Sequence, residues 1–157
     1  MEESPKKILR QLYLIYWGVV LFWLLLGSAG YAMGLHNANG TDPGYLLSFS
    51  WWVSLLAVGA VPFGYFLYRR ELAQINPRNP LLNKLLQYRR AFSKLMVWAS
   101  ISMFVHGGLL MNVANPLIAV QVFFIFGALL LFFPHLGRIK TDAKLSEKEY
   151  RFLNEND

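Results

Sequence analysis

Long uncharged stretches alternate with short basic clusters along this 157-residue chain. No Lys, Arg, Asp or Glu occurs in residues 11–41, 43–68 or 95–137. A helix that crosses the roughly 30 Å hydrocarbon core of a membrane needs about 20 mostly apolar residues, because it rises about 1.5 Å per residue. The first two stretches each have room for one such helix. They predict membrane spans at about 12–33 and 46–68.

The third uncharged stretch is too long for one crossing, and it has a break near its middle. Residues 112–116 carry two asparagines and a proline, which mark a turn, and the proline suits the first turn of a new helix. We therefore expect two spans here, at about 91–111 and 116–133. Cleavage of the first segment as a signal peptide is disfavoured, because its apolar stretch exceeds the 7–15 residues of a signal core.

The pattern as a whole predicts an all-α integral membrane protein. Residues 1–157 would form a single domain, an antiparallel bundle of four transmembrane helices. Basic residues give its orientation, because cytoplasmic loops carry an excess of Lys and Arg. All 15 Lys and Arg residues lie before residue 11, between residues 69 and 94, or after residue 137. Both termini and the central connection are therefore predicted to be cytoplasmic, in a multi-pass protein of the cell inner (plasma) membrane.

Two segments outside the predicted spans have helix signals of their own. Residues 69–90 are predicted to form a cytoplasmic helical hairpin extension, since Asn79 followed by Pro80 favours a helix start and leucines then recur at helical spacing. Residues 137–157 are predicted to form a cytoplasmic tail with a short helix. Ser146 and Glu149 have the S-x-x-E spacing of a capping box at its start.

Composition narrows the classes of function. Charged residues make up 15% of the chain and apolar residues 55%, whereas soluble proteins average roughly 25% charged residues. An ordinary soluble enzyme is therefore excluded. Cysteine is absent, which excludes thiolate catalysis, cysteine-ligated metal centres and a disulfide scaffold. No formal charge lies inside a predicted span, although such charges mark most proton relays and ion-coupled transporters. The sequence favours a non-enzymatic role and predicts no catalytic residue and no metal site.

A few uncharged polar side chains fall at similar depth, near the outer ends of the predicted spans. His106 lies within a span, and Ser102 is one turn away on the same face. Ser28, Gln121 and His36 are the other members of this predicted ligand-binding set. Two interpretations stay open: a pocket for a quinone or another small polar ligand, with haem ligation as a variant, or hydrogen bonds that hold the helices together. The residues identify no particular cofactor.

Basic residues at the predicted inner boundary are expected to contact lipid head groups, because anionic lipids attract Lys and Arg near the membrane surface. They are Arg69, Arg70, Arg89, Arg90 and Lys94. The expected partners are the lipid bilayer and other membrane-protein subunits or a second copy of the chain. Nucleic acid is not an expected partner, because the bilayer lies beside the basic face.

Three functions remain open at this point. The leading hypothesis is a non-catalytic accessory or assembly subunit of a larger membrane complex. The second is a quinone- or haem-binding electron-transfer component centred on His106. The third is an oligomeric pore or carrier for an uncharged solute.

Overall fold

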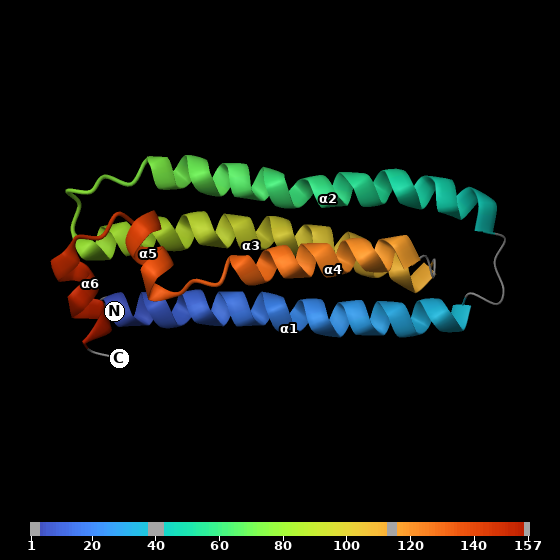
Figure 1. The fold of residues 1–157 in the computed structure, drawn as a ribbon, viewed down its shortest axis with the longest axis horizontal. Helices are drawn as coiled ribbons and strands as arrows, with labels where there is room; N and C mark the ends of the chain where they lie inside the picture. Colours follow the sequence, from blue (N-terminus) through green and yellow to red (C-terminus); the bar gives the residue numbers. More distant parts are fainter. Residues whose placement is uncertain (1–3, 38–42, 113–115, 156–157) are drawn as a thin grey trace.

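The protein is an all-α bundle in a computed structural model that describes residues 4–37, 43–112 and 116–155. No strand occurs in these ranges. The elements in chain order are α1 (Pro5–Asn37), α2 (Pro43–Ala73), α3 (Leu81–Asn112), α4 (Pro116–Leu131), α5 (Leu136–Asp142) and α6 (Glu147–Asn154). Each of the first four runs antiparallel to the next in the chain, and α5 and α6 fold back across one end of the bundle (Figure 1).

Helices α1, α2 and α3 are each long and apolar enough to cross a membrane. A fourth span qualifies only if α4 and α5, which meet at 79°, are counted as one broken helix. The 16 residues of α4 rise about 24 Å, less than the roughly 30 Å hydrocarbon core. The helix ends at Leu131 rather than at the expected residue 133, because the last turn tightens: Phe132 N–H donates to the Leu129 carbonyl at 2.9 Å, three residues back.

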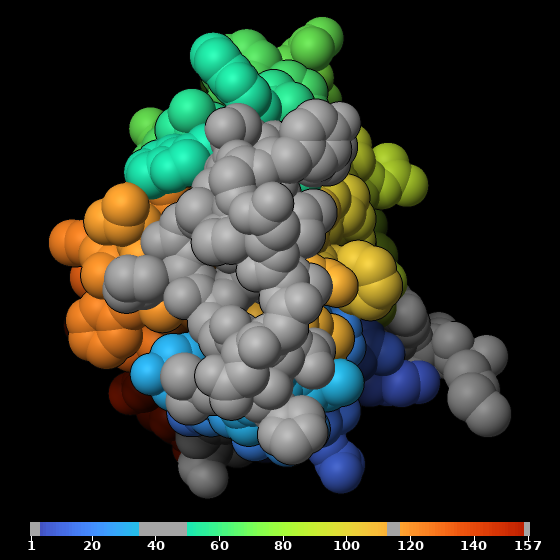
Figure 2. Space-filling view, turned by 90° about the vertical axis from the view of Figure 1, so that its right-hand side faces the viewer, coloured from blue at the N-terminus to red at the C-terminus, as the bar shows by residue number. Residues whose placement is uncertain are grey.

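Helix α3 is the centre of the bundle, because it packs extensively along both α1 and α2. Viewed along the bundle, α3 and α4 lie on opposite sides, between α2 and α1 (Figure 2). Glycines bring α3 close to its neighbours. A Cβ atom added at Gly64 would lie 2.6 Å from the Cβ of Trp98, and one added at Gly30 would lie 2.9 Å from the Gly107 carbonyl oxygen. Small residues at such points let helices approach closely enough for van der Waals contact between backbones.

Both termini, the α2–α3 turn, α5 and α6 lie at the same end of the bundle, on the left in Figure 1. The 33 residues of α1 rise about 50 Å, so this helix is about 20 Å longer than a hydrocarbon core. The apolar core of the bundle continues into the extra length at this end. Its buried side chains include Leu85 and Tyr88 of α3, Ile139 of α5 and Leu153 of α6.

Local helix signals explain most of the boundaries. Helix α3 begins directly after Pro80, and α4 begins at Pro116, as the sequence predicts. The predicted capping box of α6 is confirmed: Ser146 N–H donates to Glu149 Oε2 at 2.7 Å, and Glu149 N–H donates to Ser146 Oγ at 3.4 Å. Helix α5 was not predicted. Its N-cap is His135, which accepts from the Arg138 N–H at 3.2 Å, and histidine is not among the residues that usually mark a helix start.

Candidate functional site

Polar groups of four residues from three helices meet inside the bundle, and we call these residues the polar cluster: Ser54 of α2, Ser102 (through its backbone carbonyl) and His106 of α3, and Gln121 of α4. His106 Nδ1 lies 2.7 Å from the Ser102 carbonyl oxygen, and its Nε2 lies 3.3 Å from Ser54 Oγ. The Ser54 hydroxyl also contacts the side-chain amide of Gln121. A neutral imidazole that donates from Nδ1 presents Nε2 as an acceptor. Ser54 has a single hydroxyl proton, which it can donate either to Nε2 or to Gln121 Oε1.

Three members of the cluster are closed to the surroundings of the bundle, and Gln121 is partly buried. Ser54, Ser102 and His106 each have 0% exposure. The Ser102 hydroxyl has no hydrogen-bond partner among the described residues. The backbone carbonyl of Ser102 accepts the hydrogen bond from His106. A buried polar group costs free energy unless it is paired. Both ring nitrogens of His106 lie within hydrogen-bond distance of groups in the bundle itself, so the arrangement suits joining α2, α3 and α4 better than binding an exchangeable ligand.

The other predicted ligand-binding residues do not join the cluster. Ser28 is exposed on α1, where its hydroxyl donates to the Leu25 carbonyl of its own helix at 3.1 Å. It lines a separate groove of about 360 Å³ whose walls include Trp23, Phe123 and Phe126. The His36 side chain lies outside the described residues. The predicted set is therefore divided, with Ser102, His106 and Gln121 together and Ser28 apart.

Ser54 is the member of the cluster that the sequence prediction missed. The prediction placed polar residues by their depth from the ends of the spans, and Ser54 lies deeper in its helix than those positions. The spacing of α2 still contains a usable signal. Ser50 and Ser54 are four residues apart, hence on one face, and both are buried.

The predicted lipid-contact residues gather at the end of the bundle that holds both termini. Arg69, Arg70 and Arg90 are exposed. Arg89 donates from Nη1 to the Gln11 side chain of α1, and Lys94 pairs with Glu71 of α2. Four of the five cations are therefore exposed, because Lys94 is also 45% exposed, and Arg89 and Lys94 tie α3 to its neighbours.

Helices α5 and α6, which we call the C-terminal cap, are held against α2 and α3 by charged contacts. Lys84 of α3 is almost fully buried, with 3% of its side chain exposed, and its Nζ lies 2.8 and 3.0 Å from the two carboxylate oxygens of Glu149. Burial acts to raise the pKa of Glu149, but the hydrogen bonds from Lys84 and Ser146 outweigh it, so the pKa is lowered. The sequence offered no signal for this pair, because Lys84 reads as an ordinary solvated lysine.

Two further contacts fix the C-terminal cap. Tyr68 donates to Asp142 Oδ2 at 2.6 Å, and Arg138 Nε pairs with the same oxygen at 3.3 Å. Lys144 Nζ donates to the carbonyl oxygens of Ala73 and Ile75, at 3.3 and 2.8 Å. A lysine at this point satisfies backbone acceptors that the end of α2 leaves unpaired. The cap thus closes one end of the bundle rather than extending from it as a free tail.

The chain matches no protein-family model, no curated protein and no solved structure. Among the described residues, no three His, Asp or Glu side chains are grouped as a metal ion would require. The described residues combine a buried polar cluster that joins helices, a charged cap at one end, and apolar outer faces.

The polar cluster supports a stability prediction. Replacing Ser54 with alanine should lower the stability of the bundle by about 1 kcal/mol, within the range measured for hydrogen bonds between membrane helices. In a double-mutant cycle measured by thermal unfolding, the stability effects of Ser54→Ala and Gln121→Leu should not add, because the two side chains share one contact. Ser28→Ala is the control and should change nothing, since its hydroxyl bonds only to its own helix. A fully additive Ser54–Gln121 cycle would contradict the proposed coupling.

Proposed function

We propose that the protein is a four-span membrane protein of the cell inner (plasma) membrane, with both termini and the α2–α3 turn in the cytoplasm. Support comes from the three or four helices that are long and apolar enough to cross a membrane. The 15 basic residues support this orientation in the membrane, because they lie in the parts of the chain that gather at the capped end. A broken fourth span fits this proposal, because α4 falls short of the core by about four residues' rise.

Within that membrane, we propose that the protein is a non-catalytic accessory or assembly subunit of a larger complex. The observation that carries this proposal is the outer face of α4. Phe123 and Phe124 are 74% and 72% exposed, and Leu131 is 78% exposed. Gly127 lies between them along the helix, and a Cβ atom added there would meet nothing within 4 Å.

Such a face has the features of a helix–helix interface without a partner in place. A glycine flanked by large apolar side chains leaves a notch, and notches of this kind let a second membrane helix approach closely. Aromatic side chains are also enriched where proteins associate. We therefore expect α4 to contact a helix of another subunit, which is either a different protein or a second copy of this chain.

Site-specific photocrosslinking in native membranes tests this proposal. A photoreactive amino acid in place of Phe124 should give one discrete protein adduct, and Gly127→Leu should abolish it by filling the notch. Leu25 of α1 is the matched control position, with 70% exposure, and should give no discrete adduct. Gly18→Leu controls for the added bulk, because Gly18 is likewise open. Equal labelling at both positions, together with a monomer in mild detergent, would overturn the proposal.

The two other functions stay predictions, and each has a simple test. A visible absorption spectrum and quinone extraction of the purified protein test the electron-transfer hypothesis, which has to accommodate the two close contacts that the His106 ring already makes with Ser54 and the Ser102 carbonyl. Flux of uncharged solutes into liposomes, compared with empty vesicles, tests the pore or carrier.

A further inference from the structure

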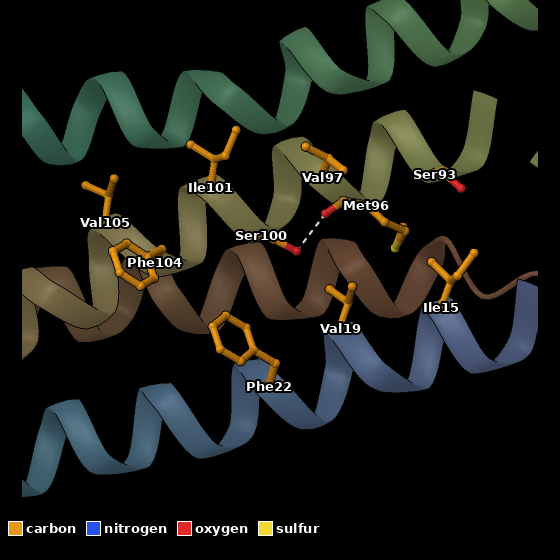
Figure 3. Close-up of a pocket in the computed structure, with 10 residues that line it drawn as sticks. All are labelled: Ile15, Val19, Phe22, Ser93, Met96, Val97, Ser100, Ile101, Phe104 and Val105. Carbon is orange, nitrogen blue, oxygen red and sulfur yellow. Dashed lines mark hydrogen bonds between the residues drawn. The ribbon is translucent and has the colours of Figure 1, made fainter. Parts of the chain in front are cut away.

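An open groove runs between α1 and α3 on the side of α3 that faces away from α4 (Figure 3). It has a volume of about 610 Å³. Ile15, Val19 and Phe22 of α1 form one wall, and α3 residues from 93 to 105 form the other. Ser93 and Ser100 are the two polar residues of this lining. The Ser100 hydroxyl donates a hydrogen bond to the Met96 carbonyl of its own helix at 2.8 Å. The groove therefore offers an apolar surface to whatever occupies it.

A second hollow of about 460 Å³ lies on the same helix, one turn closer to the capped end, and its character is different. Asn83, Gln87, Arg89 and Arg90 line it, together with Leu86. Residues 86, 90, 93 and 97 follow one another at spacings of three and four, so the two hollows lie on one face of α3. The face therefore carries an apolar groove and, nearer the capped end, a basic and polar hollow.

The dimensions of this surface match one half of a bilayer. From Arg90 to Val105 the helix rises about 22 Å, at about 1.5 Å per residue. Half of a bilayer that includes its head groups is about 20–22 Å thick. Arg90 is exposed and forms no ion pair within the described part of the chain, so its guanidinium is available to an anion at the level of the head groups.

We propose that the α1–α3 groove binds one anionic phospholipid of the cytoplasmic leaflet, with an acyl chain along the apolar lining and the phosphate beside Arg89 and Arg90. The inference rests on the membrane orientation proposed above. A guanidinium binds phosphate oxygens through paired N–H donors, so it suits this head group better than it suits a neutral one. A second helix fits the groove less well, because large side chains such as Phe22 and Phe104 line it in place of small ones.

Native mass spectrometry in mild detergent tests the site, with phosphatidylglycerol and phosphatidylcholine that have identical acyl chains. The wild-type protein should retain one phosphatidylglycerol in preference to phosphatidylcholine. Arg90→Gln should reduce that preference by about fivefold, the effect of one cation near the head groups. Arg70→Gln removes an equally exposed cation from α2 and should leave the preference unchanged. Equal retention of the two lipids by the wild type would overturn the proposal.

A second pair of variants tests the acyl-chain part of the site. Ser100→Trp fills the groove at mid-depth and should abolish retention of both lipids. Leu56→Trp places the same bulk on an exposed position of α2 and should retain the lipid. A photoreactive residue at Phe104 that captures a protein instead of lipid would show that a helix occupies the groove. If the wild-type protein shows no lipid preference while the Phe124 adduct still forms, this inference alone is wrong and the proposed subunit role stands.

Discussion

Replacing Gly64 with alanine should destabilise the bundle by about 1–3 kcal/mol, the usual cost of overpacking a tight interface. The added Cβ would lie 2.6 Å from the Cβ of Trp98. That atom is fixed to the α3 backbone, so no side-chain rotation relieves the clash, and α2 must move away from α3. Thermal unfolding should show the midpoint falling by about 5 °C.

Gly59→Ala is the matched control for this prediction. Gly59 lies in the same helix, and a Cβ atom there would meet nothing within 4 Å. Both substitutions change the helix propensity of the backbone in the same way. The difference between the unfolding temperatures of the two variants therefore isolates the contact with Trp98. If both variants unfold at the same temperature, the close packing of α2 on α3 described here is wrong.

Replacing Glu149 with alanine should release α6 from the end of the bundle. The substitution leaves Lys84 as a buried cation without a counter-charge, and removing one partner of a buried pair costs about 3 kcal/mol. Undocking of the helix exposes Lys84 to water and avoids that cost, so the effect should be local. Hydrogen exchange should speed up about a hundredfold across residues 147–154, with little change in the middle of α3.

Two variants separate the charge of Glu149 from its capping role. Glu149→Gln keeps a side chain that can complete the capping box but removes the negative charge, so it should still loosen α6. Glu147→Gln breaks the Lys140–Glu147 pair, in which the two side chains are 35% and 59% exposed, and should have no measurable effect because exposed pairs contribute little. Equal effects of Glu147→Gln and Glu149→Gln would refute the special role of the buried pair.

Lowering the pH should also release α6 from the end of the bundle, without any substitution. The pKa of Glu149 is lowered in the folded protein from an ordinary value of 4.5. A lowered carboxyl pKa means that the contact stabilises the cap above pH 4.5 and that this stabilisation is lost as the pH falls through the lowered pKa. The protection factors of the α6 amides, which compare the observed exchange with the intrinsic exchange at the same pH, should therefore fall below pH 4.5 in the wild type and change less in Glu149→Gln.

The helical architecture could be predicted because it depends on properties that are local in the sequence. Uncharged stretches, Pro80, Pro116 and the Ser146–Glu149 spacing each act within a few residues, and the structure has helix boundaries at each. The end of α4 was predicted less well, because a tightened last turn leaves no mark that distinguishes Phe132 and Phe133 from helical residues.

The candidate site could be predicted only in part, because it depends on which residues meet across helices. Ser102 and His106 share a helix face, so their proximity follows from spacing alone. Ser54 reaches His106 through the packing of α2 on α3, and Ser28 faces away from the cluster because of how α1 is rotated. Neither rotation is encoded in spacing within one helix. The burial of Lys84 likewise depends on α6, which is distant in the sequence.

Membrane topology is the claim on which the proposed function depends, and the absence of cysteine makes it directly measurable. Single-cysteine variants at Asp42 and Arg78 can be treated, in intact cells, with a maleimide that does not cross membranes. The proposed topology predicts labelling at position 42 in intact cells and labelling at position 78 only after the membrane is permeabilised. Labelling of both positions from the same side would contradict it.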